Sequence, residues 1–138
     1  MFACALYLDV SKAFDTVSHQ LLLRKLHRLG FRGPFYSLLE NFLSQRSQLV
    51  SIGGFKSSRL PLKAGVPQGS VLSPLLFNIF VNDMASVVSG CTLYQYADDT
   101  LLVSRHINLH DSFNTLEENA THIMDWFADN MMATGDRC

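Results

Sequence analysis

Two adjacent acids, Asp98 and Asp99, stand between two short runs of strand-forming residues, TLYQYA before them and TLLV after them. This pattern predicts a β-hairpin that carries two carboxylates where the chain reverses. Two like unit charges about 4 Å apart repel by roughly 4 kcal/mol at an effective dielectric constant near 20, and a divalent cation removes that repulsion. Carboxylate oxygens suit Mg2+, and two such ions about 3.5 to 4 Å apart are a common device for displacement at phosphorus. The alternative interpretation is a solvated turn.

A third acid, Asp9, lies near the end of an apolar run over residues 2–10. We expect this run to form a buried strand, because its residues are almost continuously apolar. If the strand joins the same sheet as the acidic hairpin, adjacent strand ends bring Asp9 close to Asp98, and three acids then surround two Mg2+ ions. The alternative for Asp9 is an ordinary turn residue at a strand end.

The composition favours one compact domain, with 138 residues of which 48% are apolar and 17% charged. The three cysteines, Cys4, Cys91 and Cys138, are too widely spaced for a zinc pattern and odd in number for a disulfide framework. We therefore expect an intracellular protein, in the nucleus or the cytoplasm, and we find no signal peptide or membrane span.

The net charge of −1 hides a strong asymmetry. Residues 1–69 carry nine Lys and Arg against three Asp and Glu, whereas residues 70–138 carry two against nine. A basic half beside an acidic half fits a surface that holds a phosphate backbone next to a cation site. An ordinary scatter of solvated charges is the alternative.

The remaining pattern predicts an α+β fold, a small antiparallel sheet with helices packed on one face. Ser18 should cap a helix over residues 19–29 with a stripe of Leu21, Leu22, Leu26 and Leu29, and Gly30 should end it. Further elements are expected as follows: a helix from Pro34 with Phe35, Leu38, Leu39, Phe42 and Leu43 buried; a hairpin or two short strands over residues 48–63; a Gly- and Pro-rich loop over 64–70; a long helix over 73–88; and a helix over about 111–133 on Phe113, Leu116, Ala120, Ile123, Met124 and Phe127.

Three segments in order, LDVSKAFDTVSHQLLLRKL, GVPQGSVLSPLLFNIFVNDM and YADD, resemble the A, B and C motifs of reverse transcriptases. The resemblance is closest to non-LTR retrotransposons of the LINE or jockey-like kind. It implies a polymerase palm, an RNA template with a DNA primer, deoxynucleoside triphosphates as substrates, and two Mg2+ ions, with Mn2+ as a substitute. It also implies one partial domain over residues 1–138, a palm with part of the fingers, without the N-terminal fingers or the C-terminal thumb.

The resemblance assigns roles residue by residue. Asp9, Asp98 and Asp99 match the metal-binding acids, and Phe14 matches a steric gate against a ribose 2′-hydroxyl. Ala13 and Phe14 match positions near the triphosphate, Gln68 and Gly69 match a loop that packs on the nucleotide, and Tyr96 and Ala97 match positions near the primer end. In an extended strand, Tyr96 and Asp98 would share a face. Core packing is the alternative for Phe14 and for Tyr96.

Basic residues, Lys12, Arg24, Lys25, Arg28 and Lys63, are candidates for phosphate contact, although surface basic residues usually serve solubility. Two other functions stay open at this point. The chain resembles, less closely, reverse transcriptases of group II introns and retrons. A non-catalytic RNA-binding remnant of a retroelement is the alternative from another class.

Overall fold

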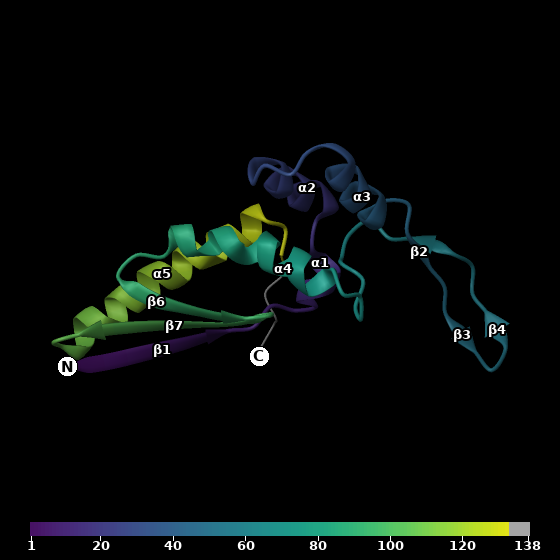
Figure 1. Cartoon of the computed structure of the whole chain (residues 1–138). Helices are drawn as coiled ribbons and strands as arrows, with labels where there is room; N and C mark the ends of the chain where they lie inside the picture. Colours follow the sequence, from purple (N-terminus) through teal and green to yellow (C-terminus); the bar gives the residue numbers. More distant parts are fainter. Residues whose placement is uncertain (133–138) are drawn as a thin grey trace.

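The computed structural model describes residues 1–132. A three-stranded antiparallel sheet of order β1-β7-β6 forms one half of the body, built from β1 (Phe2–Leu8), β6 (Cys91–Tyr96) and β7 (Asp99–His106). Helix α5 (Leu109–Asp129) lies along one face of this sheet (Figure 1), where Thr100, Leu102 and Ser104 are buried. The opposite face leaves Tyr7 and Tyr94 exposed. The expected α+β arrangement with helices on one sheet face is confirmed.

Strand β1 differs from the buried strand that we expected over residues 2–10. It ends at Leu8, and its burial alternates, with Leu6 and Leu8 partly covered and Tyr7 77% exposed. The continuous apolar run suggested a strand covered on both faces, but β1 lies at the edge of a sheet of which only one face is packed.

Helices α1 (Ala13–Thr16), α2 (His19–Arg28) and α3 (Gly33–Leu43) follow β1. The predicted cap of α2 is confirmed, because the Ser18 hydroxyl accepts a hydrogen bond from the Leu21 amide, and Gly30 follows the helix with φ of 96°. Only part of each predicted stripe is buried. Leu22 and Leu26 of α2 and Leu39 and Leu43 of α3 enter the core, whereas Leu29, Phe35 and Leu38 are more than half exposed.

The helix expected over residues 73–88 is in fact two elements, α4 (Ser73–Val81) and the 3₁₀ helix η1 (Asn82–Val87). Within η1, the Asp83 carboxylate accepts hydrogen bonds from Lys25 of α2 at 2.7 Å and from the Trp126 indole of α5 at 3.1 Å. Lys25 also donates to the Phe80 carbonyl and lies over the Phe80 and Trp126 rings. The tighter turn thus occurs where three helices are joined through one carboxylate.

Helix α5 buries Leu116, Ile123 and Phe127 as predicted, but one edge of its buried face differs from the prediction. Phe113 is 57% and Met124 43% exposed, while Ser112 and Asn119 are buried. These two polar residues are satisfied internally. Ser112 shares hydrogen bonds with Ser104 of β7, and Asn119 bonds both the amide and the carbonyl of Ser89. The helix begins two residues before its predicted start and ends at Asp129, earlier than predicted, while the predicted last residue, Ala133, lies outside the described residues.

The segment over residues 48–63, predicted as a hairpin or two short strands, is a hairpin-like ribbon of four very short strands. β2 (Ser47–Gln48) pairs with β5 (Leu60–Pro61), and β3 (Ser51–Ile52) pairs with β4 (Phe55–Lys56) across Gly53 and Gly54. This ribbon extends away from the rest of the protein (Figure 1). Within residues 1–132, no helix is both long enough and apolar enough to cross a bilayer.

Candidate active site

The three predicted acids lie at one end of the central sheet. The β6–β7 turn is a two-residue loop of Ala97 and Asp98, because Tyr96 pairs with Asp99. Leu8 pairs with Thr100, so the same register carried one residue further places Asp9 opposite Asp99. Residues opposite each other in an antiparallel pair project from the same face. Asp99 of β7 therefore lies between Tyr96, its partner on β6, and Asp9, which directly follows the end of β1, with Asp98 in the adjoining turn.

This arrangement corrects one detail of the sequence prediction. Tyr96 does not share a strand face with Asp98, since β6 ends at Tyr96 and Asp98 lies in the turn. Tyr96 is instead the cross-strand partner of Asp99 and is 85% exposed. Ala97 has a positive φ of 52°, which permits the chain to reverse in only two residues.

The donor chemistry of these acids suits a hard divalent cation, because each of them supplies carboxylate oxygens. Asp9 and Asp99 are exposed and Asp98 is half-buried, so solvent reaches this end of the sheet. Among residues 1–132, however, no group of three His, Cys, Asp or Glu side chains already converges closely enough to hold a metal ion. The backbone thus brings the three acids to one end of the sheet, but their side chains do not converge into a complete metal-binding site.

Phe14 follows Asp9 in the sequence, lies in the short helix α1, and is partly buried. Its ring stacks on Phe77 of α4 with centroids 4.3 Å apart and an interplanar angle of 19°. Ala13 beside it is only 2% exposed. The core contact and a gate role are compatible, because stacking on a fully buried ring fixes the direction of the Phe14 side chain.

The Gly- and Pro-rich loop over residues 64–70 is fastened to the turn after Asp9 by backbone hydrogen bonds. The Gly65 amide donates to the Val17 carbonyl and the Val66 amide to the Phe14 carbonyl, both at 2.8 Å. The Gly65 carbonyl also accepts a 2.6 Å hydrogen bond from the His19 ring. At Gly65, with φ of 91°, a Cβ would lie 2.9 Å from the Asp15 carbonyl oxygen. Only glycine allows the two segments to approach this closely.

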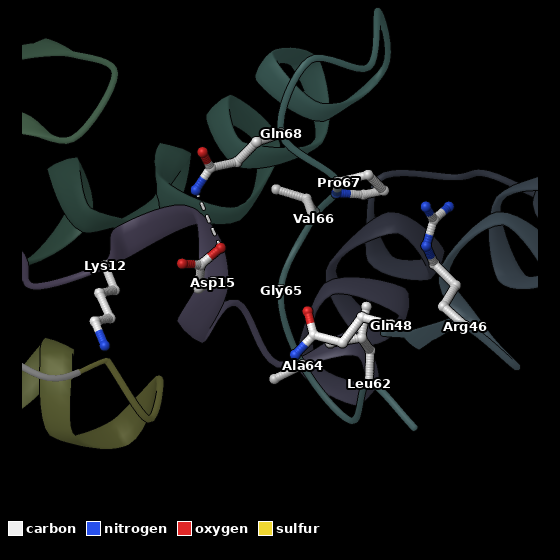
Figure 2. Close-up of a pocket in the computed structure, with 10 residues that line it drawn as sticks. All are labelled: Lys12, Asp15, Arg46, Gln48, Leu62, Ala64, Gly65, Val66, Pro67 and Gln68. Atoms are coloured by element: carbon white, nitrogen blue, oxygen red, sulfur yellow. Dashed lines mark hydrogen bonds between the residues drawn. The ribbon is translucent and has the colours of Figure 1, made fainter. Parts of the chain in front are cut away.

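A cleft of about 510 Å3 opens between this loop and the base of the β2–β5 ribbon. Figure 2 shows the Gln68 amide directed at Asp15, to which it donates a 3.1 Å hydrogen bond, with Lys12 and Arg46 on opposite sides of them. The lining residues are Lys12, Asp15, Arg46, Gln48, Leu62, Ala64, Gly65, Val66, Pro67 and Gln68. Two cations against one carboxylate make this lining suited to an anionic ligand.

The predicted site residues are therefore distributed over two neighbouring places. Gln68 lines the cleft, whereas Asp9, Asp98, Asp99, Tyr96 and Ala97 belong to the sheet end. Ala13, Phe14 and Gly69 line neither wall of the cleft, and a Cβ added at Gly69 would meet no heavy atom within 4 Å. The sequence analysis missed Arg46 and Gln48. Gln48 was the first residue of the predicted hairpin segment and Arg46 lay two residues before it, and neither position indicated the cleft, because their places there depend on the β2–β5 pairing.

Comparison with known proteins decides the family. The family model described as Reverse transcriptase (RNA-dependent DNA polymerase) matches residues 3–134. The chain belongs to the reverse transcriptase family. Members of this family use divalent metal ions, which agrees with the carboxylate character of the sheet end.

Similar proteins include several polymerases of mobile elements. The chain is 34% identical over 145 residues to the RNA-directed DNA polymerase from mobile element jockey of Drosophila melanogaster, covering 99% of the chain and 16% of that protein. It is 33% identical to the probable RNA-directed DNA polymerase from transposon BS of the same species, over 88% of the chain and 14% of that protein. It is 31% identical to the Pol polyprotein from type-1 retrotransposable element R2 of Popillia japonica, over 78% of the chain and 20% of that protein. The expected likeness to non-LTR retrotransposon polymerases is confirmed, and the chain spans about a sixth of the length of the first relatives.

Among solved structures, apo telomerase from Candida tropicalis, truncated from its C-terminal domain, superposes with a TM-score of 0.69. The match covers 99% of the chain and 31% of that structure at 12% identity. At this identity the likeness concerns the fold, and it agrees with the expected reverse transcriptase palm.

Proposed function

We propose that this domain is the palm of an RNA-directed DNA polymerase that adds deoxynucleotides to a primer 3′ hydroxyl on an RNA template. The observation that carries the proposal is the register of the sheet, which brings Asp9 to the end that holds Asp98 and Asp99 in a chain of the reverse transcriptase family. Residues 1–138 would supply the palm and part of the fingers of the polymerase.

Asp9, Asp98 and Asp99 would hold two Mg2+ ions, for which Mn2+ can substitute. Bound there, the ions would lower the pKa of the attacking hydroxyl and stabilise charge at the phosphorus. The carboxylates themselves fix where that chemistry occurs, because β1 and β7 set their separation along the sheet end. Exposure of Asp9 and Asp99 leaves room for nucleotide and primer at this place.

The nucleotide would be selected by residues on the two segments that are bonded together beside the acids. The Phe14 ring, braced on Phe77, would occupy the space of a ribose 2′-hydroxyl and so favour deoxynucleotides. The backbone at Ala13 and Phe14 would lie along the triphosphate. Gln68 and Gly69 would face the base, since Gln offers both donors and acceptors and Gly permits close approach.

The primer end would lie beside Tyr96 and Ala97. Tyr96 is exposed and is the cross-strand partner of Asp99, so its ring can support the sugar of the terminal nucleotide while the acids face the reacting oxygen. We place the protein inside the cell, in the nucleus or the cytoplasm, with nucleic acid and not a membrane as its partner.

Primer extension tests the proposal directly. The protein is incubated with an RNA template, a labelled DNA primer, deoxynucleotides and Mg2+, and compared with Asp98→Ala and with the matched control Asp125→Ala on α5. Extension should be lost in Asp98→Ala and kept in the control. Equal extension by all three proteins would refute the assigned role.

Two further results separate the alternatives. Phe14→Val should increase incorporation of ribonucleotides relative to deoxynucleotides, because the smaller side chain leaves space for the 2′-hydroxyl.

The second candidate, a non-catalytic RNA-binding module, is favoured by the absence of a closed acid cluster within residues 1–132. It predicts template–primer binding that neither Mg2+ nor Asp9→Asn changes, together with no extension by the unsubstituted protein.

A further inference from the structure

The ribbon of residues 46–63, which we call the arm, is the least packed part of the described chain. Every residue from 47 to 61 is exposed, and none of the four strands of the arm exceeds two residues. An isolated two-stranded hairpin is only marginally stable in water. The arm nevertheless projects from the body as an ordered ribbon (Figure 1), so it presents a surface and contributes little to the core.

All the charged residues of the arm are basic. It carries Arg46, Lys56, Arg59 and Lys63, and no Asp or Glu occurs anywhere between Glu40 and Asp83. No salt bridge involves these four cations within residues 1–132. Basic side chains that lie together on a projecting ribbon, without acidic neighbours, create a local positive potential that attracts polyanions.

The arm also exposes apolar side chains that a solitary ribbon cannot bury. Ile52 is 73% and Phe55 85% exposed, and the two residues are cross-strand partners, so their side chains lie on one face. Lys56 pairs with Ser51 and projects from the other face. An exposed aromatic ring together with basic residues on the same narrow ribbon is a combination with which proteins hold single-stranded nucleic acid, through stacking of bases and contacts to phosphates.

The base of the arm is one wall of the cleft already described. Arg46, Gln48 and Leu62 belong both to the arm and to the cleft lining (Figure 2). A strand that lies along the arm would therefore run directly into the cleft, with Arg46 at the junction. This continuity distinguishes the arm from a basic patch that happens to be on the surface.

We propose that the arm binds single-stranded RNA and guides it toward the cleft. This inference rests on the proposed function, in which the strand is the template. Lys56, Arg59 and Lys63 contact phosphates along the arm, Arg46 contacts a phosphate at the cleft, and a base stacks on Phe55. A protein partner or a second copy of the chain, docked on Ile52 and Phe55, is the outcome that would oppose this proposal.

Fluorescence anisotropy with a labelled, unstructured RNA oligonucleotide tests the proposal. The protein is compared with Lys56→Ala/Arg59→Ala and with the matched control Arg32→Ala/Arg105→Ala, which removes the same charge from exposed positions outside the arm. Each phosphate contact on a single strand contributes about 0.7 to the slope of log K against log salt. Loss of two contacts should reduce the slope by about 1.4 and weaken binding by about 25-fold at 0.1 M salt.

Phe55→Ala isolates the stacking contribution. It should weaken RNA binding by about tenfold while the salt slope stays constant, because no charge is removed. Equal weakening by the arm double variant and by the Arg32→Ala/Arg105→Ala control would overturn the proposal, since binding would then follow net charge alone. A change in oligomeric state on sedimentation, with RNA affinity unchanged, would assign the arm to protein contacts.

The test is independent of catalysis. The variant Asp98→Asn should retain RNA affinity, because Asp98 lies at the sheet end and not on the arm. Circular dichroism shows whether each variant keeps its fold, and the arm substitutions should preserve it because their positions are exposed. If primer extension fails but the arm variants lose RNA binding, the polymerase assignment fails and the arm assignment stands.

Discussion

Gly65 is the position where the loop of residues 64–70 comes closest to the segment that follows Asp9, and we expect Gly65→Ala to separate them. The added Cβ would lie 2.9 Å from the Asp15 carbonyl oxygen and 3.0 Å from its Cα. Both are backbone atoms, so no side-chain rotation relieves the clash. In addition, φ at Gly65 is 91°, a conformation that costs an alanine about 1 to 2 kcal/mol.

The magnitude follows from adding the two costs. Overpacking against a fixed neighbour costs about 1 to 3 kcal/mol, so the free energy of unfolding should fall by about 2 to 5 kcal/mol in total. Gly30→Ala is the matched control, because Gly30 has φ of 96° and a Cβ added there would meet no heavy atom within 4 Å. It should show only the backbone cost, about 1 to 2 kcal/mol.

Urea unfolding, followed by the fluorescence of the single tryptophan, Trp126, measures both variants. Trp126 is 6% exposed, so its emission should shift on unfolding. The reasoning predicts a loss for Gly65→Ala that exceeds the loss for Gly30→Ala by about 1 to 3 kcal/mol. Equal losses would show that the approach of the loop to Asp15 places no steric demand on residue 65.

Two further predictions concern the links between the helices. Lys25→Met should lower the free energy of unfolding by about 2 kcal/mol at pH 7 in urea unfolding, because Asp83 loses a charged donor. Burial lowers the pKa of Lys25 from 10.5, so at pH values between the folded pKa and 10.5 the unfolded chain binds more protons than the folded chain. The free energy of unfolding of the wild type, relative to that of Lys25→Met, should therefore grow as the pH rises through this range. A difference that shrinks instead would contradict burial as the cause of the lowered pKa. Asn119→Ala should cost about 2 to 3 kcal/mol by thermal or urea unfolding, since it leaves the Ser89 amide and carbonyl without partners, whereas Thr121→Ala on the exposed side should change stability by less than about 0.5 kcal/mol.

The sequence predicted best what depends on local chemistry. Ser18 as a cap and Gly30 after the helix were both predicted, because each depends on the conformational preference of a few residues. The hairpin was predicted too, but its reversal was placed at Asp98 and Asp99, whereas the turn is Ala97 and Asp98, and Asp99 begins β7. The end of the sheet that carries the acids could also be predicted, since strand ends of an antiparallel sheet meet once the hairpin and β1 pair.

The sequence predicted less well what depends on tertiary contacts. The buried face of α5 includes Ser112 and Asn119, which an apolar pattern places outside, because their hydrogen-bond partners lie on β7 and at Ser89. The change from α4 to η1 likewise coincides with the bonds of Asp83 to Lys25 and Trp126. Arg46 enters the cleft through a strand pairing that no short motif encodes.

Binding of Mn2+ tests the central claim, that Asp9, Asp98 and Asp99 at the end of the sheet act as one cation site. The amount of free Mn2+ is measured by electron paramagnetic resonance in the presence of template–primer and a deoxynucleotide. We compare the protein with Asp9→Asn, with Asp98→Asn and with the matched control Glu117→Gln on the exposed side of α5. The account predicts saturable binding that either aspartate substitution weakens and the control preserves. Binding that is the same in all four proteins would contradict it.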